Sequence, residues 1–167
     1  MRKHGTDVLM RIRTDMEKIF SGMNCLLVNV GVFSSVSGED LGISANLSPH
    51  EILSEFRSLD TEIVFYGLGA EDFASTSDFG DMITKNGHSV TDNRAYVRTK
   101  ANAGGCVVLS SELSDMDIFH QDVFSVTPVS ASLDLKAVAN YVSNFNGEAV
   151  FTELGNLIVS SKSGRRE

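Results

Sequence analysis

The tightest restriction on the fold comes from the stretch Cys25–Phe33, CLLVNVGVF. A strand with one face in water alternates apolar and polar residues, whereas this run is apolar at almost every position. It therefore predicts a β-strand that is buried on both faces. The chain has 167 residues, 42% of them hydrophobic, and folding at this size buries roughly two-thirds of the unfolded surface. We expect a single globular domain over residues 1–161 and a flexible basic tail at 162–167.

Helix signals occur in four segments. The clearest is Ser48-Pro49-His50-Glu51, where Ser48 can cap a helix, Pro49 suits the first helical position and Glu51 can close a capping box. Repeats of apolar residues at three- and four-residue steps indicate the other helices. These cover 1–22 (an amphipathic helix that we place at the periphery), 69–87 and 132–147.

Two segments predict β-hairpins. In 94–111, Arg94–Lys100 alternate as a half-exposed strand, and Asn102–Gly105 form a turn into the apolar strand Cys106–Ser110. In 149–161, a Leu-Gly-Asn turn separates two short strands. Because hairpins need antiparallel pairing, we expect an α+β fold. It would have a mostly antiparallel or mixed sheet of about seven short strands, with about four helices.

Composition excludes several classes of protein and site. The two cysteines, Cys25 and Cys106, are too few for a disulfide scaffold, a four-thiol zinc site or an iron–sulfur cluster. The four histidines lack metal-ligand spacing, so we expect no metal and no cofactor. No apolar run approaches the roughly 18 residues that a membrane span needs. We expect a cytoplasmic or intracellular protein with no membrane partner.

Acidic residues are frequent in the predicted loops, where grouped carboxylates can bind magnesium or act as general acids and bases. None of them has the spacing of a calcium-binding loop, and solvated acidic side chains are the default in loops. We therefore predict no carboxylate site. The residues considered are Glu39, Asp40, Glu71, Asp72, Asp78, Asp81, Asp115, Asp117 and Asp122.

The segment Gly67-Leu68-Gly69-Ala70 follows an apolar strand and precedes a possible helix, which is the setting of a nucleotide-binding turn. The third glycine of that motif is missing, and Glu71 and Asp72 at the helix start would repel a pyrophosphate. A plain strand-to-helix turn is the favoured interpretation. Gly67 and Gly69 stay as alternative ligand-binding residues.

Cys106 follows two glycines at the start of a predicted strand, where a thiol could act as a nucleophile. A catalytic cysteine needs a histidine base brought close by the fold, and His88 and His120 are the alternatives. The simpler interpretation is a small buried residue, because free cysteine is among the most buried residue types. The favoured prediction therefore assigns no catalytic residue.

The formal net charge of −8 hides a division along the chain. Residues 1–18 and 162–167 together hold eight basic and four acidic residues, a charge of +4, whereas 19–161 hold six basic and eighteen acidic residues, a charge of −12. Opposite charges in separate segments steer association and fix its register. The predicted interface residues are Arg2, Lys3, Arg11, Arg13, Arg165 and Arg166.

Our main hypothesis is a non-catalytic protein–protein interaction or self-assembling structural subunit, whose basic ends dock on the acidic body of a neighbour. Its partner is itself or another protein. One alternative is a small cysteine- or histidine/carboxylate-dependent hydrolase, and a second is a small-ligand or nucleotide sensor. Nucleic acid is an unlikely partner except weakly through the basic ends, since Arg94, Arg98 and Lys100 on one strand are a small footprint beside the acidic body.

Overall fold

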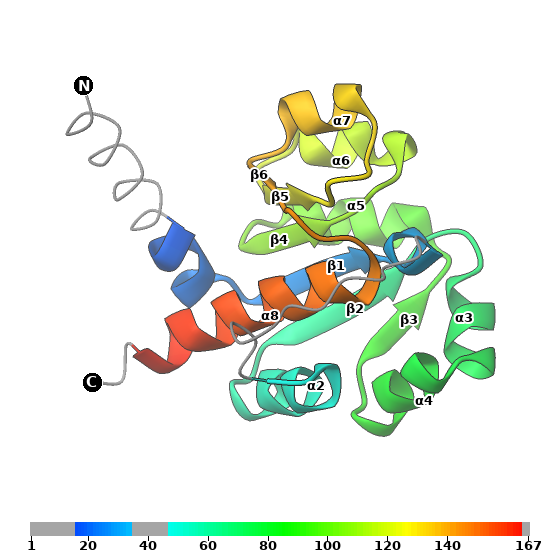
Figure 1. The fold of residues 1–167 in the computed structure, drawn as a ribbon, viewed down its shortest axis with the longest axis vertical. Coiled ribbons are helices and arrows are strands. Elements are labelled where there is room, and N and C mark those ends of the chain that lie inside the picture. The colour runs from blue at the N-terminus through cyan, green and yellow to red at the C-terminus, as the bar shows by residue number, and fades with distance from the viewer. Residues whose placement is uncertain (1–15, 35–46, 165–167) are drawn as a thin grey trace.

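The computed structural model describes residues 16–34 and 47–164, in which strands and helices alternate (Figure 1). Residues 16–22 are helical. The elements that follow are β1 Cys25–Asn29, η1 Val30–Ser34, α2 Pro49–Ser58, β2 Glu62–Tyr66, α3 Ala70–Thr76, α4 Asp78–Lys85, β3 Ser89–Thr91, α5 Arg94–Asn102, β4 Cys106–Leu109, η3 Leu113–Asp115, α6 Met116–Phe119, β5 Phe124–Thr127, α7 Leu133–Val138, β6 Tyr141–Val142 and α8 Gly147–Gly164, where η marks a 3-10 helix.

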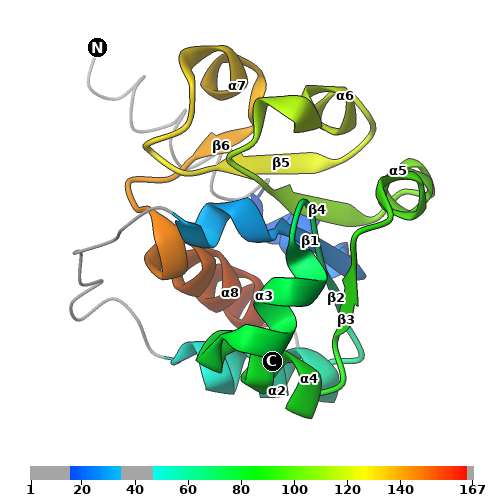
Figure 2. The same ribbon diagram turned by 90° about the vertical axis from the view of Figure 1, so that its right-hand side faces the viewer.

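One six-stranded sheet, in the order β3-β2-β1-β4-β5-β6, runs through the described part of the chain. Every neighbouring pair of strands is parallel. The chain builds outward from β1 to β3 on one side, then crosses to β4 and builds outward to β6 on the other (Figure 2). Parallel neighbours cannot be joined by tight turns, so the connections carry helices that cover the sheet.

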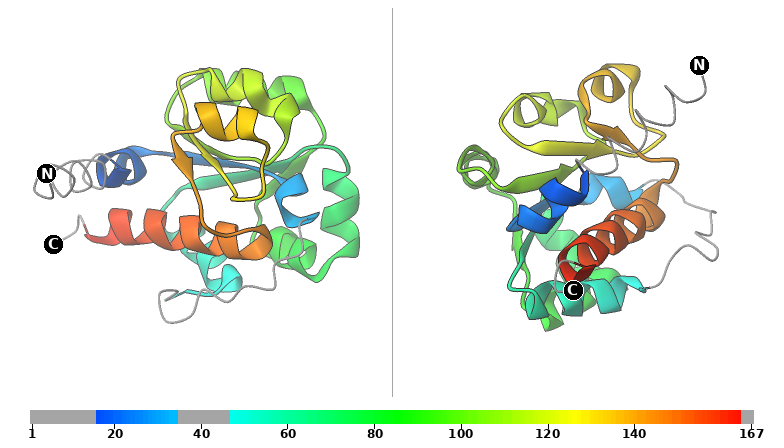
Figure 3. Two further views of the ribbon diagram at one scale, coloured as in Figure 1. Left: turned by 45° about the horizontal axis from the view of Figure 1, so that its top comes forward. Right: turned by 90° about the vertical axis from the view of Figure 1, so that its left-hand side faces the viewer.

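Helices cover both faces of this sheet (Figures 2 and 3). One core cluster joins alternate strand residues, such as Leu26 and Phe65, to α2, α4 and α8. The other joins the intervening residues, such as Leu27 and Val64, to α5, α6 and α7. All five residues of β1 are buried. The prediction of a strand buried on both faces is confirmed, although the strand ends at Asn29 and η1 takes up the remainder of the apolar run.

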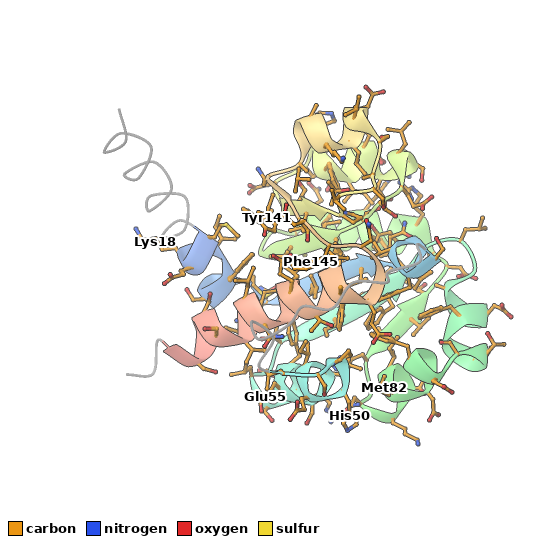
Figure 4. All side chains as sticks on the ribbon, viewed as in Figure 1. Lys18, His50, Glu55, Met82, Tyr141 and Phe145 are labelled. Carbon is orange, nitrogen blue, oxygen red and sulfur yellow. The ribbon has the colours of Figure 1, made fainter. Side chains whose placement is uncertain are left out.

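The capping box that begins α2 is also confirmed. The backbone N–H of Glu51 donates to Ser48 Oγ over 3.2 Å, and the Ser48 N–H donates to Glu51 Oε1 over 2.9 Å. Pro49 occupies the first helical position. His50, next to it, is exposed and points away from the ribbon in Figure 4.

The predicted α+β class with antiparallel pairing is wrong, because all strand pairs are parallel and the fold is a layered α/β fold. The hairpin predicted for 94–111 is a helix, α5, followed by β4. Asn93 caps the start of α5, because its side chain accepts from the Tyr96 N–H over 3.2 Å, and the helix buries Val97 and Ala101. Two apolar residues four apart lie on one helix face. In so short a segment they also fit a strand that alternates.

The second predicted hairpin, at 149–161, is likewise wrong, since the whole segment lies in α8. Gly155, taken for part of a turn, lies where α8 packs on α2. A Cβ at this position would come 2.6 Å from Cγ2 of Ile52, so the glycine permits a close helix contact. The buried side chains of α8 instead repeat at helical spacing: Val150, Phe151, Leu154 and Ile158.

The helix predicted for 132–147 is shorter than expected. α7 ends at Val138, β6 follows, and Gly147 begins α8 rather than ending a helix. Glu153 of α8 then holds the β6 segment in place. It accepts hydrogen bonds from the Tyr141 hydroxyl over 2.8 Å and from Ser143 Oγ over 2.6 Å. Tyr141 and Phe145 lie beside α8 in Figure 4.

Most of the helix predicted for 1–22 lies outside the described residues, but its last turns, 16–22, are helical. They lie beside the end of α8 (Figure 3), where the Lys162 ammonium donates to the carbonyl oxygen of Met23 over 2.6 Å. Within the described ranges, no helix has the length and apolar character needed to cross a membrane.

Candidate functional site

Polar side chains converge where β1, β2 and β4 end. Parallel α/β sheets bind ligands outside the carboxyl ends of their strands, at the point where the chain switches from one side of the sheet to the other. In this sheet that point lies between β1 and β4. Asn29 ends β1, Tyr66 ends β2 and Ser110 follows β4, and all three are buried.

Asp115 is the centre of this cluster, which we call the Asp115 cluster: Asn29, Tyr66, Arg94, Ser110 and Asp115. The Asp115 side chain is completely buried. Its Oδ2 accepts three hydrogen bonds, from Asn29 Nδ2 over 2.9 Å, from the Tyr66 hydroxyl over 2.7 Å and from Ser110 Oγ over 2.6 Å. One carboxylate oxygen therefore ties together the ends of three strands.

Arg94, at the start of α5, faces the other oxygen of Asp115. Its Nη2 lies 2.7 Å from Oδ1, although no N–H group is aligned as a hydrogen bond to that oxygen. The same guanidinium contacts the carbonyl oxygen of Ser114 and lies 3.1 Å from Oδ1 of Asp117. Burial alone would lower the pKa of Arg94, but the negative charge of Asp115, together with the hydrogen bond and charge of Asp117, raises it above its ordinary value.

The Tyr66 hydroxyl stays protonated in this setting. Burial, the charge of Asp115 and the hydrogen bond to Asp115 together hold the pKa of Tyr66 well above its ordinary value. Ser110 also fixes the segment that carries Asp115, because its hydroxyl accepts from the Glu112 N–H over 3.0 Å.

Two glycines, Gly31 and Gly67, lie close to the Asn29 side chain. Its Oδ1 accepts from the Gly31 N–H over 2.8 Å. Gly67 has a positive φ of 117°, and a Cβ there would come 2.5 Å from the same oxygen. A Cβ at Gly31 would come 2.5 Å from Glu112 Oε2. Glycine is thus required at Gly67 both by conformation and by the space that Asn29 fills.

Gly67 and Gly69, the alternative ligand-binding residues, therefore lie at the carboxyl edge of the sheet. Both have positive φ, and the Gly67 carbonyl accepts from the Ala70 N–H over 3.1 Å as the chain turns into α3. The Glu71 N–H, in the first turn of α3, faces the Asp92 carboxylate at 3.4 Å. The structure shows a strand-to-helix turn here, next to the Asp115 cluster.

Cys106 lies at the opposite end of the sheet, where it pairs in register with Cys25. A hydrogen bond between the two thiols and burial raise the pKa of Cys25. His88 instead contacts the Leu53 carbonyl oxygen through Nε2 at 2.8 Å, and His120 is exposed after α6. No hydrogen bond within the described ranges joins either histidine to Cys106. The predicted interface residues Arg2, Lys3, Arg11, Arg13, Arg165 and Arg166 lie outside the described residues.

Sequence reasoning missed most of the Asp115 cluster. It considered Asp115 only among acidic residues of loops, and it placed Arg94 on a strand. The available signal was Asn29, the one amide side chain inside the apolar run Cys25–Phe33. A polar residue at the end of a buried strand needs partners, and here those partners are Asp115 and Gly31.

Neither a protein-family model nor a curated protein matches this chain. Solved structures do. A protein described as a HAD superfamily (subfamily III A) hydrolase from Legionella pneumophila is similar with a TM-score of 0.66 and 14% identity, over 93% of each chain. The chain has the HAD-like α/β fold. The likeness to 3-deoxy-D-manno-octulosonate 8-phosphate phosphatase from Yersinia pestis has a TM-score of 0.66 and 14% identity, over 89% of this chain and 87% of that one.

Another similar structure is the Moraxella catarrhalis 3-deoxy-D-manno-octulosonate 8-phosphate phosphatase in complex with magnesium, phosphate and KDO. Its TM-score is 0.65 at 11% identity, over 90% of this chain and 93% of that one. These neighbours contradict the main sequence hypothesis of a self-assembling structural subunit, because HAD-like phosphatases are hydrolases. Of the three hypotheses, they favour the small hydrolase.

The described residues at this edge of the sheet do not fit a divalent metal such as the magnesium of the Moraxella catarrhalis structure. No three histidine, cysteine, aspartate or glutamate residues of the described ranges are grouped as metal ligands. At the Asp115 cluster, Oδ2 already accepts three hydrogen bonds and Arg94 faces Oδ1. We therefore derive no step that uses a metal ion.

Proposed function

We propose that this protein binds a small phosphorylated molecule beside the Asp115 cluster, where two arginines of α5 already grip a carboxylate. The observation that carries the proposal is the geometry around Asp117. Arg98 Nε donates to its Oδ2 over 2.6 Å, and Arg94 Nη2 donates to its Oδ1 over 3.1 Å. Paired guanidinium groups match carboxylate and phosphate oxygens alike.

In the proposed complex, two phosphate oxygens take the places of the two carboxylate oxygens of Asp117. Burial opposes its charged form, but the hydrogen bonds from Arg98 and Arg94 lower the pKa of Asp117 below its ordinary value. Its side chain is 44% exposed and that of Arg98 is 49% exposed. Exposed ion pairs are worth only about 0–1 kcal/mol, so a phosphate dianion can displace the Asp117 carboxylate.

The position of this pair supports the proposal. Arg94 begins α5 shortly after the carboxyl end of β3, and Asp117 lies on α6 shortly after the carboxyl end of β4. Both therefore lie at the edge of the sheet where α/β proteins bind ligands. The HAD-like neighbours include phosphatases, one of them in complex with phosphate.

Hydrolysis of the bound phosphate ester is the second candidate function, because the fold neighbours are phosphatases. Glu112 is a partly exposed carboxylate close to Gly31, just after the end of β1. A carboxylate in that place can act as a general base toward water. We also propose an intracellular location, with which the two free, buried cysteines are compatible.

The test is calorimetric titration with inorganic phosphate and with 3-deoxy-D-manno-octulosonate 8-phosphate, with phosphate release followed in parallel. Asp117→Asn removes the competing carboxylate and should tighten binding by about two- to fivefold. Arg98→Met should weaken binding about tenfold. Asp81→Asn, which breaks the exposed pair with Lys85 on α4, should change nothing.

Weaker binding by Asp117→Asn, or unchanged binding by Arg98→Met, would refute the proposed site. Phosphate release that Glu112→Gln abolishes would establish hydrolysis as the function. Binding without release would leave recognition of the phosphorylated molecule as the function.

A further inference from the structure

We propose that Arg94 is a built-in cation that neutralises Asp115 in place of a divalent metal ion, so that the Asp115 cluster neither needs nor binds a metal. This inference does not rest on the proposed function. It concerns how the ends of β1, β2 and β4 are held together in a fold whose solved neighbours include magnesium- and cobalt-bound proteins.

The charge of Asp115 is compensated by Arg94. A buried carboxylate is strongly destabilising unless a cation and hydrogen bonds compensate it. The three donors on Oδ2 come from neutral groups, the amide of Asn29 and the hydroxyls of Tyr66 and Ser110. The positive charge comes from Arg94, whose Nη2 lies 2.7 Å from Oδ1. The next basic residues of α5 are engaged elsewhere, Arg98 with Asp117 and Lys100 with Glu62.

The hydrogen-bond donors around Asp115 are oriented differently from the ligands of a metal site. A magnesium site presents oxygen lone pairs to the ion from about six directions. Around Asp115 the neighbours present hydrogens instead, and they point at the carboxylate. The Asn29 side chain turns its amide nitrogen toward Asp115, and its Oδ1 accepts from the Gly31 N–H. The cluster is therefore built to surround an anion, with Asp115 as that anion.

The Arg94 side chain is held in place by contacts beyond Asp115. Arg94 is anchored by the Ser114 carbonyl oxygen and by Asp117, and its side chain is 30% exposed. Both charged groups are thus fixed by the elements that follow β3 and β4, α5 on one side and η3 with α6 on the other. Folding of the sheet therefore brings the Arg94 cation and the Asp115 anion together.

The test combines a double-mutant cycle with a cobalt titration of the unliganded protein. Arg94→Met should lower Tm by about 10 °C, because it leaves a buried charge unpaired. The Arg94→Met/Asp115→Asn double variant should lose several degrees less than the sum of the two single variants. The exposed pair of α4 is the control: Lys85→Met and Asp81→Asn should lower Tm by about 2 °C or less, without coupling.

Cobalt(II) provides the second measurement, because its absorption spectrum reports binding directly. Cobalt should give the unmodified protein and Asp115→Asn the same spectrum, with no saturable signal that depends on Asp115. EDTA should leave the Tm of the unmodified protein unchanged. A cobalt or magnesium site that depends on Asp115 would overturn the proposal, as would additive losses in the Arg94–Asp115 cycle. If Arg94→Met does not fold, Arg94→Lys, which keeps the charge, takes its place. Its Tm should exceed that of the double variant Arg94→Lys/Asp115→Asn by more than half of the difference between the unmodified protein and that double variant. Equal Tm values for those two variants would also overturn it.

Discussion

Asn29 ends the central strand, and its amide group sets the chemistry next to Asp115. The amide nitrogen donates to Asp115 Oδ2 over 2.9 Å, and the amide oxygen accepts from the Gly31 N–H over 2.8 Å. The amide does both, whereas an ionised carboxylate at this position has no proton to donate. With Asn29 in place, Asp115 is a single carboxylate that Arg94 can neutralise. An aspartate at position 29 would make a pair of carboxylates, which would need a further cation.

Asn29→Asp tests this reading. The change places a second carboxylate in contact with Asp115, and two carboxylates in contact cannot both ionise without cost. We expect the free energy of unfolding to fall by about 3 kcal/mol at pH 7.5. One of the two carboxyl groups would have a raised pKa in the folded state, so the loss should grow as pH rises through that pKa and shrink toward pH 5.

Urea unfolding at several pH values measures the effect. Asn24→Asp is the matched control, because Asn24 is exposed just before β1 and should show neither the loss nor the pH dependence. An Asn29→Asp protein as stable as the Asn24→Asp protein at pH 7.5 would contradict the role assigned to Asn29.

Among the elements, local sequence predicted those that local chemistry determines. The capping box of α2 needs only Ser48, Glu51 and the backbone between them, and the apolar run predicted β1 from its own composition. The segment 94–102 could not be assigned so simply, because its charged residues occur at alternate positions while Val97 and Ala101 also fit a helix. Because β4 pairs in parallel with β1, the connection before β4 must cross over the sheet, and here it does so as a helix. That requirement depends on the strand order of the whole sheet and not on the local sequence.

α8 shows the same limit, since glycine and asparagine suggested a turn at its centre. Asn156 instead bonds to Leu47, accepting from its N–H over 2.9 Å and donating to its carbonyl oxygen over 3.1 Å. Gly155 makes room for Ile52 of α2. Both residues serve tertiary contacts, which a local sequence pattern does not reveal.

Gly155→Val should therefore destabilise the protein through overpacking against α2, by about 1–3 kcal/mol in denaturant unfolding. Shortening the facing side chain in Gly155→Val/Ile52→Ala should recover part of the loss. Gly22→Ala, at a position with open space around it, is the control and should be nearly neutral. A loss for Gly155→Val that Ile52→Ala does not reduce would show that the helix contact is not its cause.

At the scale of the whole molecule, the six parallel strands bring distant segments to one edge. Asn29 and Asp115 are 86 positions apart in sequence, and Tyr66 and Asp115 are 49 apart. The candidate site could not be predicted for this reason, because strand order decides which loops meet. The few basic residues of the acidic segment 19–161 are concentrated on a helix that begins near this edge of the sheet. Three of the six basic residues between 19 and 161 lie on α5, each paired with a carboxylate: Arg94, Arg98 and Lys100.

We propose that this chain binds a phosphorylated molecule with arginines and without a metal ion. The most direct test of this proposal is the calorimetric titration of the full chain with 3-deoxy-D-manno-octulosonate 8-phosphate, in EDTA and in magnesium. We predict the same affinity in both buffers, and tighter binding by Asp117→Asn in both. Binding that occurs only with magnesium would refute recognition without a metal ion. Binding that is lost in Asp117→Asn would refute the arginine site.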